Sequence, residues 1–580
     1  MQMSTWVYYS RRVRSRLTLW LLVLATALTP LARAQDNAPQ ENIIHGRVLN
    51  QRTTEPIARA LVTAAGEEYA TFTDDHGQFE IKIVEQMPVS SNVTANVRVM
   101  TSERISTGMG NPQWFEARKP GFLPPNLVSG TTRMPSGKSS NLTIYLVPEA
   151  LVIGHVEVPG TEGEVHIACE LYRRTMTEGR EDWQPAGTFT SWSDGEFRFS
   201  KLAAGSYKVI THEEMDRDAR LGVPGAALFG YPPVYYPNTT DFSAAAPVTV
   251  RAGETAQIHL TVARRPYFPV HISVSDAPAG RPMNLSVYPV GHRSPGWSLG
   301  YNPMDQAIEG NLPNGTYTVE ADALGESSGI ANLVVNGRPA SATLQLVPNT
   351  SITVNIHQDF KSAQASSGMA MEGANLSADE QILLQTQVML MPVEALRRLG
   401  HTVARPVPGS QGRILTFPNV RPGSYRVQVV AGGGYAAGIE SGGIDLLRQP
   451  LVVGFGGGNA PIEVTLRDDG AEVSGTVEQE AASAQTEVNP PSHYIYLLPA
   501  EESASQIRQS ATWRGNSFTL AQVPPGDYLA MAFDQVMQEL PYGNEEALRP
   551  LLNKGKMIHV EAGQKVNVDN LKLLSAGEAE

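Results

Sequence analysis

The 580-residue sequence predicts an all-β protein, a tandem array of about five β-sandwich modules. Apolar and polar residues alternate along most of the chain, as they do in strands with one buried face, and stretches with helical periodicity are few. A strand, a tight turn and a second strand carrying Gly-x-Tyr recur at intervals of one domain length. Glycine (52 residues) and proline (41 residues) are moderately enriched, which is typical of short strands joined by many turns.

The Gly-x-Tyr pattern sets the period of the array. Its tyrosines are Tyr207, Tyr317, Tyr425 and Tyr528, so the spacings are 110, 108 and 103 residues. Spacings of this size indicate whole domains, because solenoid repeats are about 20–50 residues long. A tyrosine at a sandwich edge commonly buries its ring and fixes a loop through its hydroxyl, so we expect these four residues to be structural.

A second repeated element, consisting of a strand, a glycine-containing turn and another strand, closes each module. It occurs near 136–147, 248–262, 333–347, 451–466 and 557–573. The module that follows residue 150 has an aromatic insertion, and the last module has a short helical insertion at 544–555. The predicted modules, numbered one to five, are residues 43–148, 151–265, 266–348, 350–468 and 470–580.

Residues 1–34 predict a secretory signal peptide. A cluster of arginines at 11, 12, 14 and 16 precedes the apolar stretch 17–31, and Ala32-Arg33-Ala34 fits the small-x-small cleavage pattern. The apolar stretch is short for a membrane span of about 20 residues, so an uncleaved anchor is the alternative. We expect export to the periplasm, the cell surface or the extracellular space, and no membrane span in the mature chain.

Charge and cysteine content exclude several classes of protein. Cleavage after Ala34 removes five arginines and leaves 40 basic against 58 acidic residues, which changes the net charge from −13 to −18. No basic cluster lies outside the N-terminus, so nucleic acid is not expected as a partner. The single cysteine excludes an intramolecular disulfide and a multi-cysteine zinc site. Cys169 lies on the apolar face of an alternating segment, which predicts a buried thiol.

Module one carries several motifs in a defined order. Ile44-His-Gly46-Arg-Val48 is followed by Thr73-Asp-Asp-His-Gly77-Gln-Phe79 and then by Lys119-Pro-Gly121-Phe122. In this order the motifs resemble the carboxypeptidase regulatory-like domain, a transthyretin-like sandwich of the superfamily that includes starch-binding-like and Cna-B-like domains. The resemblance implies Ig-like/transthyretin-like β-sandwich modules in a secreted bacterial protein, and it implies no enzymatic role. Module one departs from the repeat because it lacks Gly-x-Tyr, and its equivalent region runs through Trp114-Phe115.

Patterns that would indicate catalysis or metal binding are either absent from the sequence or have a structural explanation. No histidine begins the His-x-x-Glu pattern of zinc carboxypeptidases, and we expect neither a metal nor another cofactor. Gly325-Glu-Ser327-Ser-Gly329 matches a nucleophile pattern, but strands are predicted on both sides where a strand and then a helix are required. The loops at 74–77 and 193–195 could hold calcium, but they lack a ladder of alternating ligands, and Asp-Gly favours a hairpin turn.

The insertion at 211–247 is the candidate binding site. Its aromatic residues, which lie among prolines, are Phe229, Tyr231, Tyr235 and Tyr236; upstream are His212, Glu213, Glu214, Asp216 and Asp218. Exposed tyrosines can stack on a sugar ring while carboxylates accept its hydroxyl hydrogen bonds. The alternative is that the segment folds back over the sheet and caps the core. Tyr542 in module five is a weaker second candidate.

These observations predict a non-enzymatic, exported binding or scaffolding protein of the cell envelope. Its expected partner is a polysaccharide or another envelope protein. One alternative is carbohydrate binding through the aromatic insertion, and another is protein adhesion by strand addition at sandwich edges. An enzyme with a site between modules is the remaining alternative.

Overall fold

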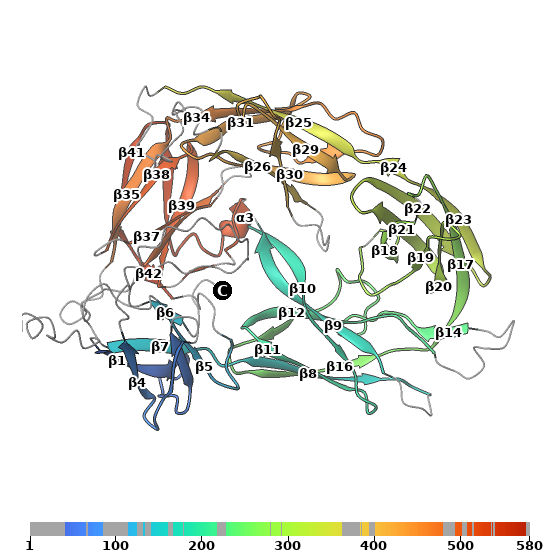
Figure 1. Ribbon diagram of the computed structural model, residues 1–580, viewed down its shortest axis with the longest axis horizontal. Helices are drawn as coiled ribbons and strands as arrows, with labels where there is room; N and C mark the ends of the chain where they lie inside the picture. The colour runs from blue at the N-terminus through green and yellow to red at the C-terminus, as the bar shows by residue number, and fades with distance from the viewer. Residues whose placement is uncertain are drawn as a thin grey trace, which may run out of the picture. The chain divides into compact units, whose positions relative to one another are not determined.

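The computed structural model describes residues 41–64, 68–84, 114–124, 131–133, 141–160, 166–177, 179–216, 228–278, 280–291, 293–361, 383, 385–393, 401–478, 493–500, 507–512, 516–534, 536–537, 540–543 and 545–575. The predicted signal peptide lies outside these residues and remains a prediction. The chain divides into two compact units, one ending at Leu146 and one formed by residues from Val147 onward together with Gly121–Leu123. Figure 1 shows both units built almost entirely from strands.

One three-stranded arrangement occurs five times among the described residues. In each case the first strand of a module lies in the middle. It pairs antiparallel with a later strand on one side and parallel with the closing strand of the module on the other. The five sets are β4 (Gln78–Val84)-β1 (Glu41–Asn50)-β7 (Asn141–Leu146), β11 (Glu196–Leu202)-β8 (Ala150–Glu157)-β16 (Thr255–Thr261), β20 (Ala307–Pro313)-β17 (Arg265–Ser275)-β23 (Ala340–Gln345), β29 (Ile414–Val420)-β25 (Thr350–Gln358)-β34 (Ile462–Arg467) and β38 (Ser517–Val523)-β35 (Ala471–Val477)-β41 (Lys565–Leu571).

A second sheet accompanies each of these sets. These sheets are β3 (Tyr69–Phe72)-β2 (Leu61–Ala64)-β5 (Trp114–Arg118)-β6 (Thr131–Arg133), β10 (Arg180–Thr190)-β9 (Ala168–Thr177)-β12 (Gly205–Thr211)-β15 (Val248–Val250), β18 (Asn284–Pro289)-β21 (Gly315–Ala323)-β22 (Ser327–Val335)-β24 (Val347–Pro348), β27 (Thr402–Val403)-β26 (Gln387–Pro392)-β30 (Gly423–Val430)-β33 (Leu451–Val453) and β37 (Arg508–Ala511)-β36 (Tyr494–Pro499)-β39 (Gly526–Phe533)-β40 (Lys556–Val560).

Short elements extend these sheets. They are β13 (Glu214–Met215), β14 (Leu228–Tyr231), β19 (Gly300–Asn302), β28 (Arg405–Pro406), β31 (Tyr435–Ser441), β32 (Ile444–Asp445) and β42 (Leu573–Leu574). The predicted helical insertion of module five contains α3 (Glu545–Leu548), which is shorter than the segment 544–555. Leu548 and Leu551 are buried in a cluster of module five, so the insertion packs against that module.

The cores explain why the chain folds as tandem sandwiches. Burial alternates along β8, β34 and β35, so each of these strands has one apolar face. In module four the buried residues from both sheets form one cluster that includes Val354, Phe417 and Val427. The predicted fold class, an all-β tandem array of β-sandwich modules, is therefore confirmed. The module boundaries remain predictions. Backbone pairing between β14 and β17 spans the boundary that is predicted between residues 265 and 266.

The four repeated tyrosines lie at one corner of their modules. Each is buried, and each hydroxyl donates a hydrogen bond to the backbone carbonyl four residues earlier, at Ala203, Pro313, Arg421 and Pro524, over 2.7–3.0 Å. Gly205, Gly423 and Gly526, two residues before their tyrosines, have φ of 153°, 149° and 152°, which strongly favours glycine. The repeated motif is therefore architectural, as its recurrence predicts. In module one, which lacks a tyrosine at the corresponding position, Phe115 of β5 is buried.

Removing one of these hydroxyls should loosen one corner only. Tyr425→Phe leaves the Arg421 carbonyl without its donor, at a cost of about 1 kcal/mol. Hydrogen exchange in the turn at residues 421–425 should then become about fivefold faster. Tyr145→Phe, at an exposed ring of β7, is the control and should leave exchange unchanged. Equal exchange rates in Tyr425→Phe and the wild type would contradict the structural role.

A second repeated contact is a phenylalanine ring lying over a glycine on the facing strand. Gly46 is opposite Phe79 in module one, and Gly154 is opposite Phe197 in module two. The same pairing joins Gly475 to Phe518 in module five. A Cβ atom at Gly154 would lie only 2.0 Å from Phe197 Cζ. The absence of a side chain at this position therefore lets the tip of the Phe197 ring approach the backbone of β8 closely.

Candidate functional site

The aromatic insertion of module two does not present its rings as one exposed platform. Tyr231 and Tyr235 are buried, with relative exposures of 1% and 0%, so neither ring can stack on a sugar in this conformation. Tyr236 is half-buried and packs against the core of module two. Phe229 is half-buried beneath the Arg264 guanidinium, which lies 4.0 Å from the ring centroid. The binding role proposed for these four residues remains a prediction, and only two of the rings keep partial access to solvent.

The insertion covers the outer face of the sheet β10-β9-β12-β15. Tyr235 and Phe242 from the insertion join Tyr172, Trp183 and Ile210 of the sheet in a separate buried cluster. The Phe242 ring meets those of Tyr172 and Tyr235 edge-on, with centroids 5.3 and 5.8 Å apart. The segment therefore adds a third layer to module two, which is the capping arrangement that the sequence left as an alternative.

A buried lysine fixes this third layer. Lys208 Nζ donates a hydrogen bond to the Phe242 carbonyl over 2.9 Å, and it lies 4.7 Å from the ring centroids of both Trp183 and Phe242. Burial lowers the pKa of Lys208, and the nearby carboxylates Glu181 and Asp241 partly oppose that shift. The cation is thus held by a carbonyl and two aromatic faces, which is a stabilising arrangement.

A carboxylate and a histidine form a pair beside this layer. Glu170 is buried, and its Oε2 accepts a hydrogen bond from the Tyr172 hydroxyl over 3.1 Å. His212 Nε2 lies 2.9 Å from the same oxygen. These contacts hold the Glu170 carboxylate and the His212 ring in fixed orientations. Within the described ranges, no group of three or more His, Cys, Asp or Glu side chains is arranged to hold a metal ion.

The insertion also joins module two to module three. β14 pairs antiparallel with β17, so the sheet of module three continues into module two. The Tyr235 hydroxyl donates to the Pro295 carbonyl over 2.6 Å, and the Glu213 amide donates to the Gly296 carbonyl over 2.9 Å. We call these contacts the two–three joint; they link the modules through both backbone and side chains.

Glu213 is the titratable group within the two–three joint. Its Oε1 accepts a 3.4 Å hydrogen bond from Ser298 of module three. Burial raises the pKa of Glu213 to about 8; the Ser298 hydrogen bonds lower it and the neighbouring Glu214 raises it. Glu213 Oε2 and the Tyr267 hydroxyl are both buried, and neither has a hydrogen-bond partner in the part of the chain that is described. Burial also raises the pKa values of Tyr267 and Tyr317, so both phenols stay neutral.

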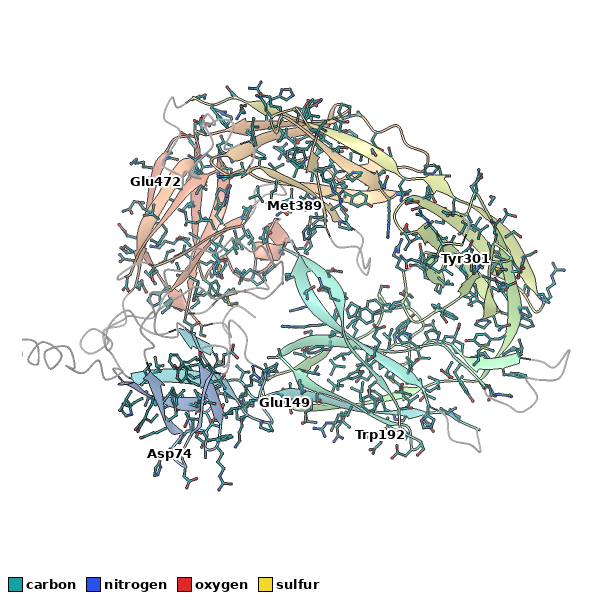
Figure 2. All side chains as sticks on the ribbon, viewed as in Figure 1. Asp74, Glu149, Trp192, Tyr301, Met389 and Glu472 are labelled. Atoms are coloured by element: carbon teal, nitrogen blue, oxygen red, sulfur yellow. The ribbon has the colours of Figure 1, made fainter. Side chains whose placement is uncertain are left out.

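The nucleophile-like motif at 325–329 and the two Asp-Gly loops lie at turns between strands, as the sequence predicts. Ser327 begins β22, directly after a three-residue turn from β21, and no helix follows it. Asp74, labelled in Figure 2, uses Oδ1 to accept backbone hydrogen bonds from His76 and Gln78. Asp194 accepts one from the amide of Glu196 in the same way. Both carboxylates therefore cap hairpin turns. Tyr542, the weaker candidate, packs partly buried against a cluster of module five.

The single thiol is shielded from solvent in the folded chain. Cys169 is fully buried, as its sequence pattern predicts, and burial raises its pKa to about 12. Thiolate is the form that reacts with disulfide reagents. We expect the native chain to remain unlabelled by an aromatic disulfide reagent at pH 8, whereas one equivalent should react in denaturant. Labelling of the native chain at the rate of the denatured chain would contradict this burial.

Sequence reasoning missed the two–three joint. In the sequence, the acidic run around Glu213 suggests acceptors for sugar hydroxyls, and Phe229 and Tyr231 fall in an insertion for which no strand is predicted. The available signal was the alternation in Leu228-Phe-Gly-Tyr231, which is compatible with a short strand. Its pairing partner in module three is not visible in such a pattern.

Comparison with known proteins gives only distant matches. No protein-family description and no curated protein matches the sequence. Three of the similar solved structures, all of bacterial proteins, are as follows. The TIE protein of Bacillus anthracis is 9% identical over 74% of each chain, with a TM-score of 0.14. The two B repeat units of the Staphylococcus aureus collagen binding protein are 11% identical and cover 74% of this chain and 100% of theirs, with a TM-score of 0.12. A streptococcal ancillary pilin is 11% identical and covers 53% of this chain and 100% of its own, with a TM-score of 0.17.

TM-scores this low carry no argument about function. The resemblance of module one to carboxypeptidase regulatory-like domains therefore remains a prediction. Over the described segments, no helix is both long enough and apolar enough to cross a membrane.

Proposed function

We propose that this chain is a non-enzymatic scaffolding or binding protein of the bacterial cell envelope. The observation that supports the proposal is the two–three joint, in which one β-sheet runs from module three into module two. A continuous sheet fixes the spacing and orientation of adjacent modules, whereas modules on a loose tether move independently. Fixed spacing is useful in a protein that holds partners apart or presents them, and the predicted signal peptide directs the chain to the envelope.

Cell fractionation and cross-linking test this function together. The full chain and a variant lacking residues 1–34 are expressed in the native host and followed by an antibody against the chain. We expect the full chain in the envelope fraction, cross-linked to a defined partner in intact cells, and the truncated chain in the cytoplasm without that partner. An envelope-located chain that cross-links to nothing, or a full chain that stays in the cytoplasm, would refute the proposal.

Carbohydrate binding by the aromatic insertion is the second candidate. Phe229 and Tyr236 keep part of their rings accessible, and Arg264 lies over one of them. Polysaccharide pull-down with the wild type, Phe229→Ala and Tyr236→Ala is the test. We expect retention by at least one polysaccharide and weaker retention for either variant. Absence of retention on every polysaccharide, or unchanged retention in both variants, would exclude this role.

A further inference from the structure

Module two carries two histidines side by side on the outer face of its first sheet. His155 lies in β8 and His259 lies in the parallel neighbour β16, and the two residues are in register. Their rings are stacked, with centroids 5.5 Å apart and an interplanar angle of 5°. Adjacent strands are about 4.7–4.9 Å apart, so in-register side chains on one face are direct neighbours.

Carboxylates flank both histidines on the same face. Glu157, two residues after His155 on β8, places Oε2 3.1 Å from His259 Nε2. On the other side of β8, Glu196 of β11 is in register with His155. The side chains of His259 and Glu157 are 53% and 54% exposed, so the group is open to ions from solution.

Glu157 can prepare His259 for metal binding. When Nε2–H donates to the carboxylate, the lone pair remains on Nδ1, and that nitrogen can bind a metal ion. Metal-binding histidines commonly donate their other ring nitrogen to a carboxylate in this way. Imidazole suits copper, nickel and zinc ions, and rotation about the side-chain bonds can direct one nitrogen of each ring toward a shared ion.

The other modules supply a comparison within the same chain. Histidine–carboxylate pairs also occur between strands at His45–Glu80, His271–Glu309, His357–Glu463 and His559–Asp527. The stacked histidine pair is found in module two alone, as far as the described residues extend. A single imidazole with a carboxylate is a weak ligand set, whereas two neighbouring imidazoles can chelate.

We propose that His155 and His259 form a two-histidine site for a divalent transition-metal ion, with Glu157 orienting His259 and water completing the coordination. The site uses only two protein ligands. It therefore differs from a metal site with three or more His, Cys, Asp or Glu ligands, of which none occurs among the described residues. It lies within one module, and it is independent of the proposed scaffolding role.

Titration of the untagged chain with Ni²⁺, followed calorimetrically, tests the site. We expect one site in the wild type and about tenfold or greater loss of affinity in His155→Ala and in His259→Ala. Glu157→Gln should lose roughly tenfold, as is usual when a carboxylate that orients a metal-binding histidine is altered. His271→Ala is the matched control, because it removes an equally exposed histidine that also faces a carboxylate, and its affinity should be unchanged.

Two outcomes would overturn the proposal. One is that His155→Ala binds Ni²⁺ as tightly as the wild type, and the other is that His271→Ala loses as much affinity as His155→Ala. Electron paramagnetic resonance of the Cu²⁺-loaded chain gives a readout independent of affinity, with two nitrogen ligands expected in the wild type and one in His155→Ala. Thermal unfolding of the metal-free variants checks that they remain folded.

Discussion

Replacing Glu213 by glutamine is expected to stabilise the two–three joint strongly at pH 9 and only slightly at pH 5. Glu213 is half-buried at the two–three joint, with its Oε2 enclosed, and burial raises the folded-state pKa of its carboxyl group from 4.5 to about 8. Burial of the charged form is the main cause, because Oε2 has no hydrogen-bond partner among the described residues to compensate for lost hydration. Glutamine resembles the protonated carboxyl group in shape and never ionises.

The sign follows from proton linkage. Between pH 4.5 and about 8 the folded joint binds a proton that Glu213 releases once it is exposed to water. Stability is therefore fully present below pH 4.5 and declines as the pH rises toward about 8. Each unit of pKa shift corresponds to about 1.4 kcal/mol, so the total loss is roughly 3–5 kcal/mol. The groups facing Glu213 are Ser298, Glu214, Tyr267 and Tyr317, and the two phenols stay neutral throughout this range.

Hydrogen exchange of the β14 and β17 amides measures this effect. Wild type and Glu213→Gln are compared at the same pH, which cancels the pH dependence of intrinsic exchange. The ratio of wild-type to variant rates should rise from about fourfold at pH 5 to at least a hundredfold at pH 9. Glu214→Gln is the control and should stay close to the wild type, because Glu214 contributes less than burial to the raised pKa of Glu213. A ratio that does not change with pH would show that Glu213 is ionised in the folded joint.

Gly154→Ala is expected to destabilise module two by about 3 kcal/mol, because the added methyl group has no space. Its Cβ would lie 2.0 Å from Phe197 Cζ and 2.5 Å from Phe197 Cε1. The Phe197 ring is fully buried in the core, so it cannot move without disturbing its neighbours. Overpacking of a well-packed core commonly costs about 1–3 kcal/mol, and a contact this short lies at the upper end.

Exchange of the β8 and β11 amides should become roughly a hundredfold faster in Gly154→Ala. Gly187→Ala is the matched control in the same module, because the nearest heavy atom to its added Cβ is 3.8 Å away. The double variant Gly154→Ala/Phe197→Leu should recover part of the loss, since leucine vacates the space over β8. Wild-type exchange in Gly154→Ala would mean that the ring has an alternative position.

Much of the fold could be predicted from the sequence because it depends on local patterns. The corner tyrosines recur at one position in four modules, and glycine is needed there for the backbone conformation at Gly205, Gly423 and Gly526. The alternation along β8 and β34 indicated which face is buried. The pairing of Gly154 with Phe197 was not predictable in this way, because it depends on the register between two strands.

The candidate site was less predictable, because its residues gain their roles from distant partners. The number of aromatic residues in the insertion was evident, but their exposure depends on the outer sheet face that Tyr235 and Phe242 cover. Glu213 gains its role from module three, because Ser298 donates a hydrogen bond to it and Tyr267 lies within its electrostatic influence. His155 and His259 are 104 positions apart, and only the parallel pairing of β8 with β16 makes them neighbours.

The parallel pairing of first and closing strands has a mechanical consequence. The chain enters each module at the start of its first strand and leaves at the end of a strand that runs in the same direction beside it. Tension between those two points acts along the strands and across the hydrogen bonds between them, so the bonds are loaded together in shear. An antiparallel hairpin pulled at its two free ends would instead open one bond at a time. Each module is thus built to resist stretching along the direction of the chain.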